Sequence, residues 1–427
     1  MDRRKFIRYA GLSSLPVFCQ GIPLFSHARS PVNEALQHLF PVDDRKVLVI
    51  IQLFGGNDGL NTLIPLEQYD LYQKARKNLA IPRNKILSLT GESRWGFHPA
   101  LTGFQELYGK GQMAMIHSVG YEKPDFSHFR STDIWMSGSG ADTNSVTGWA
   151  ARYLDKQYPG FPENYPQVQY PDPPAIQTGM AASLIFQGTR SPMSVNISDP
   201  GNVFKLQQGF DDALTDFTSG HELGFVRQVA NQTQRYSDVI KTAWAKINSQ
   251  SPYPAGNKLA EQLKLVARLI AGGLRTPVYM VSMEGFDTHA EQVDRERPFA
   301  GQHAELLQTL GDAVKAFQDD LAFLGISDRV TSMTFSEFGR RIVSNESAGT
   351  DHGAAAPLFV FGAKVNGGIY GTAPVLPENA TTADNLPMHT DYRSVYASFL
   401  NDWFKTDPTA VKEILGATYP TLPLTGS

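Results

Sequence analysis

Five stretches of the chain are dominated by β-branched and other apolar residues, and each is bounded by glycine or polar positions. The first, Val47 to Phe54, is apolar at nearly every position and ends at two glycines. Such continuous apolar runs are typical of strands that are buried on both faces, as in a parallel sheet. The same pattern predicts four further strands, within 113–119, 276–289, 329–341 and 356–362.

Two long segments between these runs have the periodicity of amphipathic helices. In the segment 303–325, apolar residues recur every three or four positions, and 259–274 shows a similar pattern. Strands that alternate with helices are typical of a doubly wound α/β domain, in which a mostly parallel sheet carries helices on both faces. We therefore expect this fold class.

The segment from about 137 to 256 differs from the rest of the chain. Pro, Tyr, Gly, Asn and Gln are frequent there, which predicts loops and short elements that cap the edge of the sheet. The last residues, 406–427, contain several Pro and Thr residues and are expected to form a C-terminal tail.

The N-terminal residues predict an export signal over 1–28. Arg3 and Arg4 precede a mildly apolar run, and a Ser-His-Ala step at 26–28 is typical of a cleavage site. Paired arginines indicate the twin-arginine export machinery, which would deliver the protein to the periplasm or the medium. A basic amphipathic helix is the alternative interpretation of the same residues.

Composition and charge exclude several other classes of protein. Removal of 1–28 would leave 34 basic and 41 acidic residues, a formal charge of −7, and no cysteine, because Cys19 is the only one. An acidic chain without basic runs is poorly suited to binding nucleic acid. No span of 18 uncharged apolar residues occurs in the body of the chain, so the mature protein is expected to have no transmembrane segment.

Acidic, hydroxyl, imidazole and guanidinium groups follow four of the predicted strands and precede the fifth. Ligands of open α/β sheets bind at the carboxyl ends of the strands, so we expect these groups to meet at one edge. The candidates at this edge are Asp58, Ser127, His128, Arg130, Asp287, His289, Glu337, Arg340, Asp351 and His352.

Carboxylates and imidazoles together suit one or two divalent ions such as zinc, manganese, iron or calcium. A hydroxyl at a helix start, as expected for Ser127, is suited to attack on a phosphoryl- or sulfuryl-type group, and Arg130 or Arg340 could hold the oxyanion.

Each candidate also has a purely structural interpretation. Ser127 and Asp287 could cap helices, and Asp351 with His352 could form a turn. Glu337 could pair with a neighbouring arginine in a salt bridge. The metal-site hypothesis rests on the number of candidates that fall at strand ends.

The order of these motifs resembles that of an uncharacterised bacterial family with twin-arginine signals, placed in the alkaline-phosphatase-like superfamily of sulfatases and phosphomutases. The matching motifs are GGNDG, SHF, FDTH, SEFGRR, GTDHG with PLFVFG, and GGIYG, over roughly residues 45–405. The resemblance implies one α/β domain over this range, with metal bound by Asp and His side chains at strand ends.

By position, the resemblance implies that Asp287, His289 and His352 are metal ligands, with Glu337 in place of the usual Asp-His pair. Ser127 falls near the usual nucleophile and Asp58 near the first acidic ligand. The sequence lacks the Cys-x-Pro-x-Arg or Ser-x-Pro-x-Arg motif of formylglycine sulfatases, which excludes that class.

We therefore expect an exported metal-dependent hydrolase of a small-molecule or polymeric phosphate or sulfate ester. The alternative is a periplasmic binding or scaffold protein that keeps the fold without catalysis. The first strand ends in Gln52-Leu53-Phe54 and not in an acidic residue, which favours this alternative. Metal-dependent hydrolysis of another bond in an envelope polymer is a third hypothesis.

Overall fold

The computed structural model describes residues 18–19, 22–23, 45–178, 183–197 and 234–426. The chain divides into two units, Met1–Asp44 and Arg45–Ser427. In the first unit, β1 (Phe18–Cys19) and β2 (Ile22–Pro23) pair antiparallel. The rest of the expected export signal, 1–28, lies outside the described residues.

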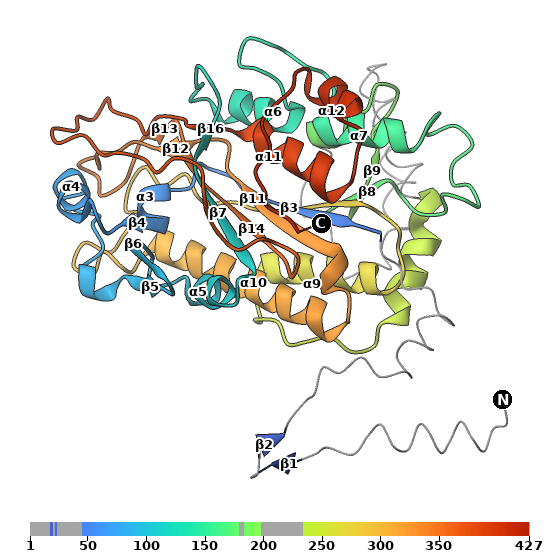
Figure 1. The fold of residues 1–427 in the computed structure, drawn as a ribbon, viewed down its shortest axis with the longest axis horizontal. Helices are drawn as coiled ribbons and strands as arrows, with labels where there is room; N and C mark the ends of the chain where they lie inside the picture. The colour runs from blue at the N-terminus through green and yellow to red at the C-terminus, as the bar shows by residue number, and fades with distance from the viewer. Residues whose placement is uncertain (1–17, 20–21, 24–44, 179–182, 198–233, 427) are drawn as a thin grey trace, which may run out of the picture. The chain divides into compact units, whose positions relative to one another are not determined.

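A nine-stranded sheet forms the centre of the second unit (Figure 1). Its strand order is β15-β7-β14-β11-β3-β10-β8-β9, and β16 also pairs with β7. All residues of β3, β7 and β11 are buried, as expected from their continuous apolar sequences. The strands are β3 (Val47–Leu53), β7 (Met113–Gly120), β8 (Ala175–Thr178), β9 (Ser194–Ile197), β10 (Val278–Met283), β11 (Val330–Phe335), β14 (Ala356–Phe361), β15 (Gly368–Tyr370) and β16 (Thr390–Asp391).

One strand of this mostly parallel sheet runs against the others. β14 is antiparallel to both of its neighbours, β11 and β7, whereas the other strand pairs of the sheet are parallel. The start of β14 therefore lies at the edge where β3, β10 and β11 end. Residues just before β14 reach the same edge as residues just after the parallel strands.

Helices cover both faces of the sheet, which confirms the expected α/β class. In Figure 1, α5, α9 and α10 lie on one side of the strands and α6, α7, α11 and α12 on the other. Apolar side chains of α10, including Leu310, Val314 and Phe317, are fully buried, as the periodicity predicts. These helices are α5 (Thr102–Gly109), α6 (His128–Ser137), α7 (Trp149–Gln157), α9 (Lys258–Ala271), α10 (Gln302–Phe323), α11 (Tyr392–Ser398) and α12 (Pro408–Leu415).

Shorter elements fill the connections between these strands and helices. β4, β6 and β5 form a small three-stranded sheet, and β12 pairs with β13. These elements are α3 (Gly59–Thr62), β4 (Leu63–Pro65), α4 (Tyr69–Ala75), η1 (Arg83–Lys85), β5 (Leu87–Leu89), β6 (Glu92–Phe97), η2 (Leu184–Phe186), η4 (Ser327–Arg329), β12 (Gly339–Arg340), β13 (His352–Gly353) and the π-helix η5 (Phe399–Trp403).

Two regions expected to be irregular contribute to the packed domain. The described part of 137–256 contains α7 and a helix over 234–246, and it adds β8 and β9 to the sheet beside β10. Within the expected C-terminal tail, α12 buries Ile414 and Leu415. The spacing of the apolar residues in that short helix could have predicted it, but the Pro and Thr content of the segment pointed to a tail.

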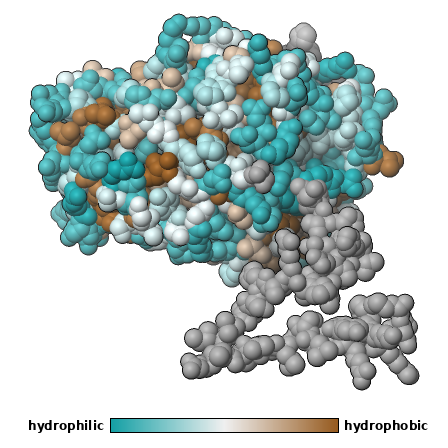
Figure 2. All heavy atoms as spheres, viewed as in Figure 1, coloured by the Kyte–Doolittle hydropathy of each residue, from teal (hydrophilic) through white to brown (hydrophobic). Residues whose placement is uncertain are grey.

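The surface of the second unit is mostly polar where it is seen in Figure 2, with hydrophobic residues in small, separate groups. Over the described ranges, no helix is both long and apolar enough to cross a membrane.

Candidate metal centre

Five segments that are distant in sequence meet at the carboxyl edge of the sheet. Asp287 and His289 follow β10, Glu337 follows β11, and His128 begins α6 after β7. His352 lies in β13, just before β14, and reaches the same edge because β14 is antiparallel. The loop after β3 packs against the backbone of Asp287. Gly55 in this loop has φ +124°, and a Cβ there would collide with that backbone. Only glycine fits this position.

Asp287, His289 and His352 form a tight triangle of ligand atoms. The Nε2 atoms of the two histidines are 2.9 Å apart. The Oδ1 atom of Asp287 lies 3.0 Å from Nε2 of His352 and 3.1 Å from Nε2 of His289. Metal–ligand bonds of about 2.0–2.2 Å place two ligand atoms at right angles on one ion about 3 Å apart, so the triangle fits a shared divalent cation.

Hydrogen bonds at Nδ1 turn both imidazoles toward this triangle. Nδ1 of His352 lies 2.7 Å from the carbonyl oxygen of Phe126, to which it can only donate. Nδ1 of His289 lies 3.3 Å from Oδ1 of Asp351, a carboxylate acceptor. Donation at Nδ1 leaves the lone pair on Nε2, so two lone pairs face each other at 2.9 Å. This arrangement is typical of metal-binding histidines that are oriented by a second hydrogen bond.

His128 extends the cluster and is held between two carboxylates. Its Nδ1 is 2.8 Å from Oε1 of Glu337 and its Nε2 is 3.3 Å from Oδ2 of Asp287. The hydrogen bond to Glu337 is the main reason why the pKa of His128 is raised, although partial burial opposes it. His128, Asp287 and His352 each offer a ligand atom within 4.8 Å of one another.

Glu337, expected as a ligand, has a different set of contacts. It is fully buried, and its Oε1 accepts hydrogen bonds from the backbone nitrogen of Gly55 and from His128. Its Oε2 accepts a longer bond from the Ser336 hydroxyl, at 3.4 Å. These contacts suit a carboxylate that orients His128. Glu337 was predicted to be a ligand because it follows a strand, and its burial could not be predicted from that position alone.

Arg340 stabilises the negative charge of Asp287 and joins the surrounding loops. Its Nη2 donates to Oδ1 of Asp287 at 2.8 Å. Burial raises the pKa of Asp287, but its contact with His352 and the hydrogen bond and charge of Arg340 lower it to about 2. The guanidinium also donates to the carbonyl oxygens of Gly55, Gly56, Phe286 and Thr350. With these bonds and no exposed side-chain surface, Arg340 is not free to hold a substrate oxyanion.

Asp58 and Arg130 do not join the cluster. Asp58 is fully buried, where its Oδ2 accepts from Arg76 at 2.5 Å and from Gln292 at 2.6 Å. Burial raises the pKa of Asp58, but the charges of Arg76 and His303 and the hydrogen bonds from Arg76 and Gln292 together outweigh it, so the pKa is lowered. Arg130 donates to the carbonyl oxygens of Ala141 and Thr143. Both side chains are bound to partners within the fold.

Ser127 lies at the N-cap position of α6, and its side chain makes no capping hydrogen bond. The residue is exposed, and its chain neighbours Phe126 and His128 both contact the cluster. Ser127 is therefore placed beside the candidate metal centre, at the positive end of a helix.

An open cleft of about 520 Å³ lies over the candidate ligands. Asp351, His289 and His352 form one side, and Phe126, Arg341, Thr382 and Ala383 form the remainder. Arg341 stands over the ring of Phe126, 5.7 Å from its centre, and donates to the carbonyl oxygen of Thr382. Sequence reasoning selected Arg340, the buried last residue of β12, and not Arg341, which directly follows that strand and lines the cleft.

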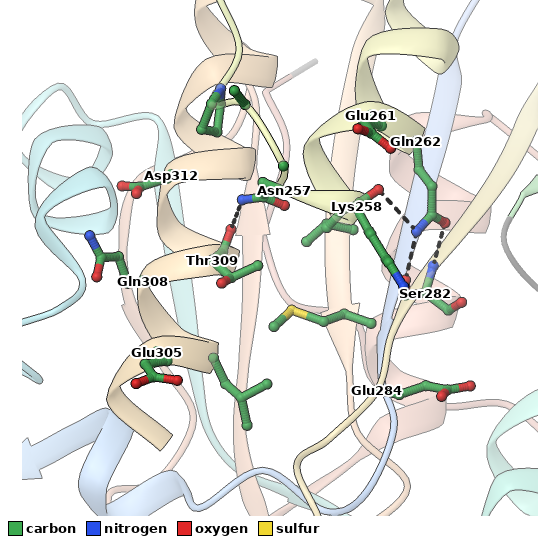
Figure 3. Close-up of a pocket in the computed structure, with 16 residues that line it drawn as sticks. Asn257, Lys258, Glu261, Gln262, Ser282, Glu284, Glu305, Gln308, Thr309 and Asp312 are labelled. Carbon is green, nitrogen blue, oxygen red and sulfur yellow. Dashed lines mark hydrogen bonds between the residues drawn. The ribbon is translucent and has the colours of Figure 1, made fainter. Parts of the chain in front are cut away.

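A second, larger groove of about 980 Å³ lies between α9 and α10, beyond the end of β10. Figure 3 shows Gln262 bonded to Ser282 and Asn257 bonded to α10 in its walls. Acidic side chains of Glu261, Glu284, Glu305 and Asp312 line this groove, but no histidine does. The imidazole and carboxylate groups suited to a transition metal are those of the cleft.

Comparison with known proteins identifies a family and several similar structures. The model of a protein family of unknown function (DUF1501) matches residues 45–415, which confirms the resemblance to an uncharacterised family. A search of the curated proteins finds no match.

Three of the similar structures illustrate the level of likeness. A protein of the alkaline phosphatase superfamily from Vibrio parahaemolyticus has 10% sequence identity and a TM-score of 0.38, and the match covers 84% of this chain and 66% of that one. The lipoteichoic acid synthase LtaP from Listeria monocytogenes has 8% identity and a TM-score of 0.33, with 82% of this chain and 76% of that one covered. The alkaline phosphatase of the Antarctic bacterium TAB5 has 12% identity and a TM-score of 0.33, with 88% of this chain and 100% of that one covered. The chain thus spans 66% of the length of the first. With TM-scores below 0.5, these likenesses carry no argument about what this protein does.

Proposed function

Since this chain belongs to a protein family of unknown function (DUF1501), we propose its activity from its own residues: an exported, metal-dependent hydrolase of phosphate or sulfate esters. The observation that carries the proposal is the convergence of Nε2 of His289, Nε2 of His352 and Oδ1 of Asp287 within 2.9–3.1 Å. Two imidazole lone pairs that face each other beside a carboxylate repel one another unless a cation lies between them.

Asp287, His289 and His352 would hold the metal, and His128 would join them through its Nε2. Two or three imidazole ligands favour zinc, manganese or iron over calcium, which prefers oxygen. When bound, such an ion polarises an ester oxygen and stabilises charge in the transition state. Glu337 and Asp351 would keep His128 and His289 in the required tautomer and orientation.

Ser127 is our candidate nucleophile, with a water molecule as the alternative. Its hydroxyl is exposed at the N-terminus of α6, where the helix dipole favours an anionic ester. His128 follows it directly, so the hydroxyl lies next to a proposed metal ligand in the chain. Arg341 faces the cleft and offers a positive charge to the substrate.

The proposal is tested on the exported protein, purified with its native metal. We expect elemental analysis to find a transition metal and aryl phosphate or sulfate esters to be hydrolysed. The variant Ser127→Ala distinguishes between the serine and a water molecule as the nucleophile, because it abolishes turnover only if the serine attacks the ester. A protein without metal that hydrolyses neither class of ester would contradict the proposal.

A catalytically inactive binding or scaffold protein is the second candidate, and one observation favours it. β3 ends in Gln52 and Leu53, both buried, and the acidic residue that follows, Asp58, is paired with Arg76. This edge therefore offers fewer free carboxylates than expected. Metal content without turnover of any ester would support this candidate.

A further inference from the structure

A second groove lies beside the cleft over the candidate metal centre. This groove, of about 540 Å³, lies between α4 and the loops 343–346 and 377–382. Thr382 lines both cavities. Asn345 lines the groove and donates to the carbonyl oxygen of His289 and to Oδ1 of Asp351, at 2.8 and 3.3 Å. The groove therefore lies next to the residues that form the candidate metal centre.

The walls of the groove are held in place by hydrogen bonds between segments. The backbone nitrogen of Ser344 donates to Ala75, and the side chain of Asn78 donates to the carbonyl oxygen of Asn345 at 2.8 Å. Lys74 donates to the carbonyl oxygen of Glu378 at 2.7 Å, which links α4 to the opposite loop. A groove that is already formed costs less ordering free energy when a ligand binds.

The polar groups of the groove are of mixed type and balanced charge. Two lysines, Lys74 and Lys77, and two glutamates, Glu346 and Glu378, line the groove, while Asn78 adds an amide and Ser344 a hydroxyl. Carboxylates only accept hydrogen bonds and ammonium groups only donate them. A ligand rich in hydroxyl groups, which both donate and accept, satisfies such a lining without carrying a charge of its own.

We propose that the groove binds the neighbouring sugar units of an oligosaccharide whose phosphate or sulfate ester lies at the metal centre. The inference rests on the proposed function for the ester and adds the class of molecule that carries it. Arg341 lines the cleft, donates to the carbonyl oxygen of Thr382, which lines both cavities, and would hold the anionic group. The substrate is then an esterified glycan longer than one unit.

The test is calorimetric binding to the full chain with its metal. The probes are sulfated and phosphorylated cello- and maltotetraose, each compared with glucose 6-sulfate or glucose 6-phosphate. We expect at least one tetrasaccharide to bind about tenfold more tightly than its monosaccharide. The double variant Lys77→Ser/Glu346→Gln, which keeps the net charge, should remove this difference. The control Lys110→Ser/Glu163→Gln changes two exposed residues outside both cavities and should keep it.

The inference would be overturned if no tetrasaccharide binds more tightly than its monosaccharide, or if the groove variant keeps this difference in affinity. It would also be overturned if a phosphopeptide exceeds the monosaccharide in affinity by the same factor. Hydrolysis of the glucose esters and metal content are measured in parallel. Tight tetrasaccharide binding without hydrolysis would leave the groove assignment standing and contradict the proposed reaction, so the two failures are distinguishable.

Discussion

The Nε2 atoms of His289 and His352 lie 2.9 Å apart, although 63 residues separate them in the sequence. Each ring is turned into this position by a hydrogen bond at Nδ1, to Asp351 and to the carbonyl oxygen of Phe126. The orientation of both rings is therefore built into the fold, as is usual for metal-binding histidines.

Replacing Asp351 with Ala should weaken metal binding without abolishing it. The carboxylate would no longer fix the tautomer of His289, and losing such a partner typically lowers metal affinity about 10–100-fold. Competition with a chromogenic chelator measures the change. Asp384→Ala, which removes a carboxylate that feels the charge of Arg341 but does not line the cleft, is the matched control and should leave the affinity unchanged. An unaltered affinity in Asp351→Ala would show that His289 needs no such partner.

Arg340 and Arg341 are adjacent but should differ sharply in their effect on stability. A lysine in place of Arg340 cannot satisfy the five acceptors of the buried guanidinium, so Arg340→Lys should lower the free energy of unfolding by about 3 kcal/mol. Arg341→Lys, in the open cleft, should change it by less than about 0.5 kcal/mol. Urea denaturation of both variants checks this. Equal losses would contradict the roles given to the two arginines.

Asp58 is predicted to stabilise the fold and not to bind metal. Asp58→Asn would leave the buried guanidinium of Arg76 without its counter-charge, which should cost about 3–5 kcal/mol of unfolding free energy. The metal content of the folded fraction should equal that of the unaltered protein. Thermal unfolding measures the loss of stability, and elemental analysis of the same preparation measures the metal content. A variant that stays stable but loses metal would identify Asp58 as a ligand.

His98 should make stability depend on pH on the acidic side of neutrality. Burial lowers the pKa of His98 to about 3, and its Nδ1 accepts from the backbone nitrogen of Ala100 at 3.1 Å. Between about pH 6.5 and the folded pKa, the unfolded chain binds a proton that the folded chain does not, so stability falls as the pH falls.

The contribution of this one histidine is about 1.4 kcal/mol per pH unit within that window. His98→Asn keeps a hydrogen-bond acceptor and cannot titrate, so its unfolding free energy should vary less steeply from pH 6.5 to 4.5. His389→Asn changes an exposed histidine and serves as the control. An unchanged slope in His98→Asn would mean that His98 is protonated in the folded protein.

The sequence predicted the central strands and the two long helices because their signals are strong and local. Runs such as Val47–Leu53 are buried in full, and the periodicity of α10 matches its buried face. It did not predict that β14 is antiparallel, since strand direction depends on pairing between distant segments. In an all-parallel sheet, residues that precede β14 would lie at the opposite edge from Asp287.

The candidate site was predicted in position but not in every role. Asp287 and His289 follow a parallel strand and lie at its carboxyl end, as a rule of α/β sheets predicts. His352 meets them only because β14 is antiparallel. The burial of Asp58 with Arg76, and the carbonyl contacts of Arg340, depend on loops whose course no local pattern encodes. The Phe126 carbonyl that orients His352 has no side-chain signal at all.

Metal content of the single variants His289→Ala and His352→Ala tests the central claim most directly. Both should lose the bound metal that the unaltered exported protein carries, because each removes one corner of the ligand triangle. His389→Ala, in an exposed loop, should retain it. The assignment would be contradicted if elemental analysis found full metal occupancy in both cluster variants.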